Sequence, residues 1–473
     1  MRKLPTLLRA LVIFLTAAIS SYSTPAQTLR LPPHEKIVLK NGLTLLLMEK
    51  HGVPIISISA IVKTGAAADP AGQEGLASIT AGLLRKGTKT RTAQQFSADL
   101  DFIGGTFGAE AQQDFTSANA EFLSKDLARG LDLFSDALLH PIFPKEEADK
   151  LLAQSMDGIT AAKDSPESVI LEYYKGYLLE NHPYGRPIGG TEISLKKIQR
   201  ESVAKFYESY YTPGNTIVAV AGDFNPADMR KKLEQTLGAW PARQPQPVSI
   251  PEPAVAKGRR LLLVDKVDAT QTYFTIGNLG TAVNDPDRVT NRLVNLLFGG
   301  QFTSMLNEAL RVESGLTYGA ESFFDSHKKP GPFAIFSYTR NETTAKAIDL
   351  ALQVLDNLHK QGVSAEKLAA AKTYIKGQFP PEIETSTQLA QIIAEHEFFG
   401  LTDDEVNQLE AKMNAVSPEM VRQAIQKHFP GDDLVFVLIG KASEIGPAVK
   451  KYAPKQDTRE ISDPGFWPPP GKL

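Results

Sequence analysis

A short proline-rich segment divides the chain into two halves of similar length. Five prolines fall within thirteen residues, in the sequence PARQPQPVSIPEP at 241–253. Proline fixes the backbone torsion φ and removes an N–H donor, so this stretch favours an extended conformation and cannot continue a helix or a central strand. A chain of 473 residues is also longer than one hydrophobic core usually supports. We therefore predict domains at 27–240 and 257–455, a linker at 241–256 and a Pro-rich tail at 456–473.

The two halves repeat the same order of strand and helix signals. The first half has strand patterns and then helical patterns, at 36–50, 54–65, 73–86 and 124–140. The second half has strand patterns at 259–266, 271–280, 322–327 and 332–340, and helical patterns at 288–297 and up to 311. Strands separated from runs of helices are typical of layered α+β domains. We expect an α+β fold of two similar domains, each a mixed β-sheet with helices packed on one face, which together form one half of a clam-shell.

The first 26 residues differ from the rest of the chain because they combine basic residues with an apolar stretch. Arg2 and Lys3 precede an apolar stretch at 7–19, and small residues follow, with Thr24 and Ala26 placed as a cleavage pair. The apolar stretch is shorter than the roughly 20 residues that span a bilayer, which disfavours a membrane anchor. We expect a cleaved signal peptide at 1–26 and a periplasmic or secreted protein that does not contact the membrane after cleavage.

Composition excludes several classes of site. The formal net charge is only -3 and there is no run of Lys or Arg, so nucleic acid is not an expected partner. Cysteine is absent, which excludes thiolate metal sites and a Cys nucleophile. No two of the eight histidines lie within one helical turn, so no local two-His metal motif exists. The one dense cluster, Glu395-His396-Glu397, is interpreted as a solvated helix face.

Several motifs together resemble the insulinase-like (pitrilysin) family of zinc metallopeptidases. The segment GLASITAGLLRKGT at 75–88 resembles the family's active-site helix, in which a Gly precedes His-x-x-Glu-His and a Lys-Gly-Thr ending follows. Three further segments resemble family motifs in the family's order: HPYGRPIGGTEIS at 182–194, FYESYYTPGNTIVAVAGDF at 206–224 and LRVESGLTYG at 310–319. The resemblance covers nearly all of the chain after residue 26.

The resemblance also implies that the zinc site has been lost. In the family, two His bind zinc and the Glu between them deprotonates the bound water, because the three share one helical face. Those positions are Ser78, Ala81 and Gly82 here, and the position of the family's third ligand, a Glu, is Gly158. The flanking Lys86-Gly87-Thr88 fixes the register. We therefore expect no metal and no cofactor in this chain.

One catalytic feature of the family is kept, an Arg and a Tyr seven residues apart. They are Arg311 and Tyr318, and the resemblance implies that such a pair reaches a zinc site from the facing domain and polarises the scissile carbonyl. Some family members work as two chains, one with zinc and one with the facing wall. The first hypothesis is thus a non-catalytic subunit that supplies Arg311 and Tyr318 to a zinc-bearing homologue acting on unfolded peptide. A stand-alone peptide-binding or scaffold protein is the second hypothesis, and a hydrolase with relocated chemistry is a third.

Overall fold

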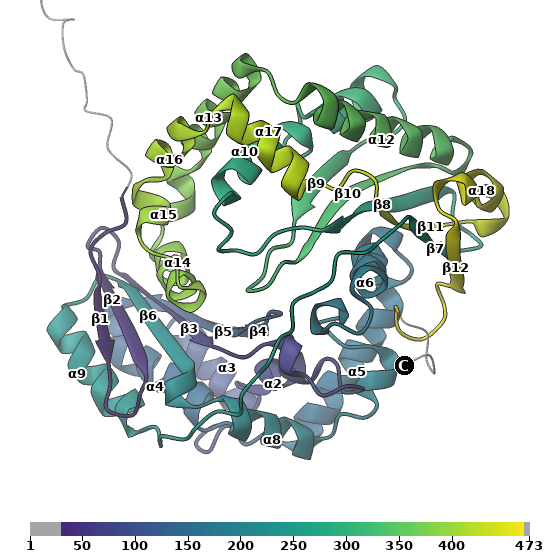
Figure 1. The fold of residues 1–473 in the computed structure, drawn as a ribbon. Coiled ribbons are helices and arrows are strands. Elements are labelled where there is room, and N and C mark those ends of the chain that lie inside the picture. Colours follow the sequence, from purple (N-terminus) through teal and green to yellow (C-terminus); the bar gives the residue numbers. More distant parts are fainter. Residues whose placement is uncertain (1–29, 468–473) are drawn as a thin grey trace, which may run out of the picture.

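The computed structural model describes residues 30–467, so the expected signal peptide and the last six residues lie outside the described part of the chain. Two six-stranded sheets form the centres of the two halves (Figure 1). The first sheet consists of β1 (Glu35–Val38), β2 (Thr44–Glu49), β3 (Ile55–Val62), β4 (Thr106–Ala111), β5 (Thr116–Leu123) and β6 (Thr216–Gly222). The second consists of β7 (Arg260–Asp265), β8 (Gln271–Leu279), β9 (Ala320–Phe324), β10 (Pro332–Arg340), β11 (Val435–Gly440) and β12 (Lys455–Glu460).

Helices surround both sheets. In the first half they are α2 (Leu76–Leu83), α3 (Ala93–Phe102), α4 (Leu127–Leu139), α5 (Lys145–Ala162), α6 (Pro166–Leu179), α7 (Glu192–Leu195), α8 (Arg200–Tyr210) and α9 (Pro226–Thr236). In the second half they are α10 (Arg288–Phe298), α11 (Met305–Asn307), the π-helix η6 (Glu308–Glu313), α12 (Thr344–Gln361), α13 (Ala365–Gln378), α14 (Ser386–Phe399), α15 (Asp404–Asn407), α16 (Leu409–Ala415), α17 (Pro418–His428) and α18 (Ala442–Val449). No helix or strand is found between Ala239 and Arg260. The predicted α+β architecture of two similar domains is confirmed.

The strand order shows that the two sheets are built alike. The first is ordered β1-β2-β6-β3-β5-β4 and the second β12-β7-β11-β8-β10-β9, so five strands of each sheet occur in the same relative order. Both sheets are mixed, because β2 pairs parallel with β6 and β7 pairs parallel with β11. The sixth strand differs, since β1 precedes β2 in the chain whereas β12 comes from the C-terminal side. Strand β12 therefore extends the second sheet past residue 455, into the segment 456–473 that the sequence predicts to be a tail.

Each sheet has helices of its own half on one face and one helix from the other half on the opposite face. Side chains on β2 alternate between two cores, because Leu45 and Leu47 pack in the first-half core while Leu46 and Met48 pack in the core of the second half. The latter core includes α14, which lies against β3 and β6 of the first sheet (Figure 1). This double burial explains the uninterrupted apolar run of β2.

The second sheet receives α6 of the first half in the same way. The fully buried side chains Tyr173, Tyr174 and Tyr177 of α6 pack against β7 and β11, at residues such as Leu262 and Val437. Helix α6 contacts β8 and β11 directly. The two halves thus exchange one helix each, which ties their positions together. Within residues 30–467, no helix has the length and apolar character needed to cross a bilayer.

Candidate functional site

Helix α2 begins at a carboxylate-capped turn. Its N-cap, Gly75, has φ +99°, and a β-carbon there would lie 2.8 Å from the Leu195 side chain, so glycine fits both the torsion and the space. The carboxylate of Asp69 accepts hydrogen bonds from the backbone N–H of Gly75 and of Ala77, each at 2.8 Å. Two N–H groups that the helix leaves unpaired are thereby satisfied. This turn fixes where α2 starts and which face it presents.

Asp69 is the most perturbed acid at this helix. Its side chain is buried, and this desolvation raises the pKa of Asp69 to about 7, although the two backbone N–H donors act in the opposite direction. The Asp69 carboxyl is therefore expected to gain or lose its proton near neutral pH.

The four expected zinc-site positions lie on two helices that pack together. Ser78, Ala81 and Gly82 lie on α2, Gly158 lies on α5, and α2 contacts α5. Ala81 is buried, and a β-carbon at Gly82 would meet the apolar Leu151 side chain at 3.0 Å. A β-carbon at Gly158 would meet no atom within 4 Å.

Zinc does not fit these residues. Zn²⁺ needs three or four nitrogen, sulfur or carboxylate donors in a tetrahedral arrangement, and the hydroxyl of Ser78 is the sole side-chain oxygen or nitrogen among the four positions.

The Lys-Gly-Thr ending of the motif has a structural role. The Thr88 hydroxyl donates to the buried carboxylate of Asp136 at 2.6 Å, and Arg91 donates to the same oxygen at 2.9 Å. These bonds hold the segment after α2 against α4, which carries Asp136. This part of the motif therefore helps to hold α2 in place, even though α2 carries no zinc ligands.

Arg311 and Tyr318 lie on a tightly held segment of the second half. Arg311 is on the π-helix η6, a rare form that often occurs at functional sites. After Glu313 the chain turns at Gly315, with φ +60°, and the backbone N–H of Leu316 donates to the carbonyl of Leu310 at 2.9 Å. The hydroxyl of Thr339 on β10 donates to the carbonyl of Leu316 at 2.6 Å. The backbone between the two residues is therefore fixed on both sides.

The side chains of Arg311 and Tyr318 have no polar partner within the described residues. Tyr318 is 77% exposed, and Arg311 is half-buried. Within the described chain neither makes a side-chain hydrogen bond or an ion pair, and the Arg311 guanidinium lies over the ring of Phe302, 4.4 Å from its centroid. Helix η6 packs against α11 and α12, whereas α2 packs against α5, α8 and β4. The two parts of the expected site thus have separate packing environments within this chain.

A polar cavity of about 690 Å³ lies between the two halves, and we call it the interdomain chamber. Ser59 and Asn119 of the first sheet line it together with Arg288, Glu395 and His396 of the second half. Burial raises the pKa of Glu395, and burial together with the nearby Arg288 lowers the pKa of His396. Glu395 is nevertheless exposed and His396 half-buried, so this part of α14 faces an open cavity, as a solvated helix face would.

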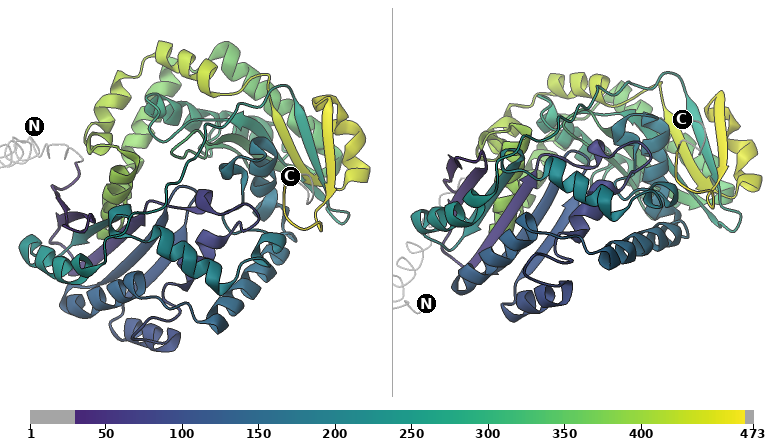
Figure 2. Two further views of the ribbon diagram at one scale, coloured as in Figure 1. Left: turned by 60° about the horizontal axis from the view of Figure 1, so that its bottom comes forward. Right: turned by 90° about the horizontal axis from the view of Figure 1, so that it is seen from below.

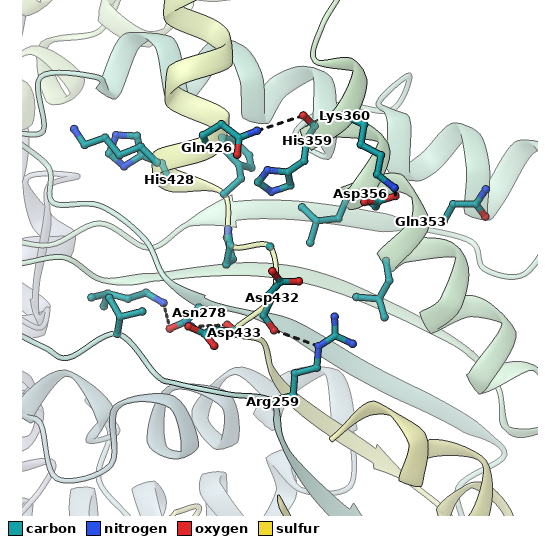
Figure 3. Close-up of a pocket in the computed structure, with 18 of the residues that line it drawn as sticks. Arg259, Asn278, Gln353, Asp356, His359, Lys360, Gln426, His428, Asp432 and Asp433 are labelled. Atoms are coloured by element: carbon teal, nitrogen blue, oxygen red, sulfur yellow. Dashed lines mark hydrogen bonds and ion pairs between the residues drawn. The ribbon is translucent and has the colours of Figure 1, made fainter. Parts of the chain in front are cut away.

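A second cavity, of about 1050 Å³, lies between α12, α17 and the loop at 429–433 (Figure 3). Its polar side chains bond to near neighbours, as Gln426 donates to the carbonyl of His359 at 3.3 Å and Lys360 donates to Asp356 at 2.6 Å. Arg259 likewise donates to the carbonyl of Asp432 at 3.2 Å. The hydrogen bonds drawn in Figure 3 join near neighbours and do not converge on a common point, while the buried His359 Nε2 has no hydrogen-bond partner within the described residues.

The sequence pattern misses one group with metal-ligand chemistry, because its members are distant in the chain. Asp285, Asp287 and His428 place their ligand atoms within 4.8 Å of one another. The imidazole Nε2 of His428 lies 2.9 Å from Asp287 Oδ2, and Lys427 Nζ lies 2.8 Å from the same oxygen. The three side chains therefore form a polar clamp between the turn before α10 and helix α17 within the described residues, and Lys427 already pairs with the Asp287 carboxylate.

Comparison with known proteins gives relatives along most of the chain. An uncharacterized zinc protease of Rickettsia bellii is 28% identical over 341 residues, which cover 72% of this chain and 81% of that protein. The uncharacterized zinc protease YmxG of Bacillus subtilis is 23% identical, over 84% of this chain and 96% of its own length. The zinc chemistry in these names belongs to those proteins.

Solved structures share the fold. The crystal structure of a peptidase M16 inactive domain from Pseudomonas fluorescens superposes with a TM-score of 0.81 at 24% identity, over 86% of this chain and 98% of that chain. A protease from Helicobacter pylori superposes with a TM-score of 0.80 at 20% identity, over 86% of this chain and 100% of that chain.

Two family profiles match consecutive parts of the sequence. The profile described as insulinase (peptidase family M16) matches residues 44–192, and the profile described as peptidase M16 inactive domain matches residues 197–375. The first profile spans α2 and α5, and the second spans Arg311 and Tyr318. The chain therefore belongs to the insulinase family of peptidases, M16, and is a homologue that lacks the His-x-x-Glu-His motif.

Proposed function

We propose that this protein is the non-catalytic subunit of a heteromeric insulinase-like zinc peptidase, located in the periplasm or secreted. In this proposal it supplies one wall of the peptide-binding chamber, with Arg311 and Tyr318, to a partner subunit that carries zinc. Unfolded peptide is the proposed substrate of the complex.

The observation that carries the proposal is a contrast between two parts of one chain. The positions of the zinc site, Ser78, Ala81, Gly82 and Gly158, offer no imidazole or carboxylate. Arg311 and Tyr318 are nevertheless present on a fixed segment, with a phenol that is 77% exposed. An exposed phenol and an unneutralised guanidinium on a rigid wall are suited to act on a molecule outside this chain.

The chemistry available to the pair is charge stabilisation. A guanidinium and a phenol are hydrogen-bond donors that can point at the oxygen of a scissile carbonyl as negative charge develops there. One such donor in a dry site accounts for roughly 10² to 10³ in rate. The pair has no base or metal of its own, so it would assist a reaction and not perform it alone.

The first experiment measures zinc and assembly together. The chain is co-expressed with a zinc-bearing M16 homologue of the same cell, and both the complex and the lone chain are dialysed. Light scattering should show a complex, with zinc on the partner and none at stoichiometric level on the lone chain, because zinc needs three or four donors. One zinc per lone chain would contradict the loss of the site.

The second experiment tests the Arg-Tyr pair in the assembled complex. Arg311→Ala and Tyr318→Phe should each lower kcat and kcat/KM by about ten- to a thousandfold, because a donor that acts on the transition state changes both. Partner binding and the partner's zinc content should stay unchanged. Wild-type turnover by both variants in a well-folded complex would show that the pair is structural.

A second candidate is a stand-alone peptide-binding protein without a role in proteolysis. The interdomain chamber supports it, because Gln113, Asn119 and His396 line its walls, and their Oε1, Oδ1 and Nδ1 atoms are buried without a hydrogen-bond partner in the described chain. Unpaired buried polar atoms are costly, so a bound polar chain that reached them would be favoured. This candidate predicts peptide binding by the lone monomer, with no complex formed beside any zinc-bearing homologue of its cell.

A further inference from the structure

An exposed phenylalanine holds the arginine of the proposed site. The guanidinium carbon of Arg311 lies 4.4 Å from the centroid of the Phe302 ring, within the range of a cation–π contact. Phe302 is 62% exposed, which is unusual for so large an apolar side chain. The ring is therefore not part of the second-half core, and its visible contact is with the arginine.

The turn that carries Phe302 is held in place on both sides. It follows α10 at Gly299, where a β-carbon would lie 2.4 Å from the backbone of Ser322 on β9, so the turn lies directly against that strand. The Asn307 side chain donates to the carbonyl of Gln301 at 3.3 Å and accepts from the backbone N–H of Ala320 at 3.0 Å. One amide thus connects the residue before Phe302 with the start of the strand that follows Tyr318.

A ring holds a guanidinium in a different way from a carboxylate. A carboxylate would neutralise the charge and occupy the N–H donors at the edge of the guanidinium. A ring stacks on the face, so the charge and the five N–H donors stay available to another molecule.

The chain contains a comparison case at its own surface. Arg129 lies 4.6 Å from the ring centroid of Phe102, which is 76% exposed. Arg129 also donates to the carboxylate of Asp99 at 2.7 Å, so its charge is paired. Within the described residues Arg311 has no such acid, and its guanidinium lies over the Phe302 ring. The difference indicates that Arg311 is oriented and left unneutralised.

We propose that Phe302 is a positioning residue, which orients the Arg311 guanidinium toward the peptide in the partner's active site while leaving its charge and its N–H donors free. This inference rests on the proposed function, since it assigns a role within the same wall. Phe302 does not touch the reacting atoms in this arrangement. Its effect passes through Arg311.

Kinetics of the assembled complex test this role. Phe302→Leu keeps an apolar side chain but removes the aromatic face, and it should lower kcat by about 2- to 30-fold with little change in KM, since a cation–π contact has about that influence. Phe302→Tyr should restore kcat. The double variant Phe302→Leu/Arg311→Ala should be no slower than Arg311→Ala, because the ring acts only through the arginine. Phe102→Leu is the matched control and should behave like wild type.

Nuclear magnetic resonance of the lone chain tests the contact itself. The Nε–H proton of Arg311 should carry a ring-current shift that Phe302→Leu abolishes and Phe302→Tyr retains. If Arg311→Ala leaves turnover unchanged, the proposed role of the pair is wrong and so is this inference. If Arg311→Ala slows the complex but Phe302→Leu does not, the pair's role stands and the inference alone is overturned. Loss of partner binding in Phe302→Leu would also overturn it, since Phe302 would then be a docking contact.

Discussion

The carboxyl group of Asp69 is an unusual cap for a helix. It accepts two backbone hydrogen bonds at the start of α2, which stabilise the charged form, yet its burial raises its pKa to about 7. In an unfolded chain the carboxyl would titrate near the ordinary value of 3.8. Between these two values the unfolded state is ionised while the folded state is still protonated. The contribution of Asp69 to stability is therefore full below about pH 4 and is lost as the pH rises toward 7.

We predict that this single residue shapes the pH dependence of unfolding. The free energy of unfolding of wild type should fall relative to that of Asp69→Asn by up to about 1.4 kcal/mol per pH unit between pH 4 and 7. Urea unfolding followed by circular dichroism at several pH values measures the difference.

Asp99→Asn is the matched control for this experiment. Hydrogen bonds from Arg91 and Arg129 lower the pKa of Asp99, so its titration falls below the same pH window. Its pH profile should run parallel to that of wild type above pH 4. Parallel profiles for wild type and Asp69→Asn would show that the Asp69 carboxyl stays ionised at its two N–H donors.

Helix α6 is the element that joins the first half to the second sheet. Tyr174 is buried, and its hydroxyl donates to the carbonyl of Phe333 on β10 at 2.7 Å. A β-carbon at Gly277 of β8 would lie 2.5 Å from that hydroxyl, so the missing side chain of Gly277 makes room for the tyrosine. The close fit indicates that contacts with the second sheet stabilise α6, although α6 lies in the first half of the sequence.

We predict that Tyr174→Ala lowers the free energy of unfolding by about 3–5 kcal/mol, because it leaves a large cavity between α6 and the second sheet. Tyr174→Phe should cost about 1 kcal/mol, since it removes one hydrogen bond and keeps the ring. Tyr374→Ala on α13 is the matched control, because Tyr374 is 46% exposed. Equal stabilities of Tyr174→Ala and the control variant would show that α6 is not held by this residue.

Some elements could be predicted from the sequence and others could not, for physical reasons. The apolar runs of β2 and β11 are visible because these central strands are buried on both faces. Strand β12, with the sequence KQDTRE, has no apolar residue, since it is an edge strand whose residues are mostly exposed. The exchange of α6 and α14 is also invisible in sequence, because periodicity shows which helix face is apolar but not which sheet covers it.

The candidate site shows the same division. The zinc-site positions and the Arg-Tyr pair can be placed because short segments of the chain resemble family motifs, so the resemblance implies their roles. The contact between Arg311 and Phe302 is not part of any motif, and the clamp of Asp285, Asp287 and His428 spans more than 140 residues of sequence. Such groups come together only through the packing of the second half.

At the scale of the whole molecule, the C-terminal segment adds a further link between the halves. It leaves β12 of the second sheet and turns back toward the first half (Figure 2). The buried Arg459 guanidinium donates to main-chain carbonyls between Asp463 and Phe466 and so shapes this turn. The backbone N–H of Gly465 donates to Glu192 of α7 at 2.8 Å. The segment is thus fastened to both halves.

This fastening ends in an aromatic contact with α6. The rings of Phe466 and Tyr173 meet edge to face at 5.2 Å, and those of Trp467 and Tyr177 at 4.9 Å. The Pro-rich linker at 241–256 is mostly exposed by comparison. Helices α6 and α14 and the C-terminal segment therefore connect the halves noncovalently, in addition to the linker.

Cutting the linker should leave the two halves associated. A site for a specific protease placed at 243–248 would be accessible, because most of these residues are exposed. After cleavage the two fragments should still elute together on size exclusion without denaturant, since each half keeps a helix of the other on its sheet and these apolar faces would otherwise be opened to water. The cleaved Tyr174→Ala variant should separate at a lower urea concentration than cleaved wild type, because α6 then holds the second sheet less tightly. Separation of cleaved wild type in native buffer would show that the linker, and not the exchanged helices, fixes the distance between the two halves.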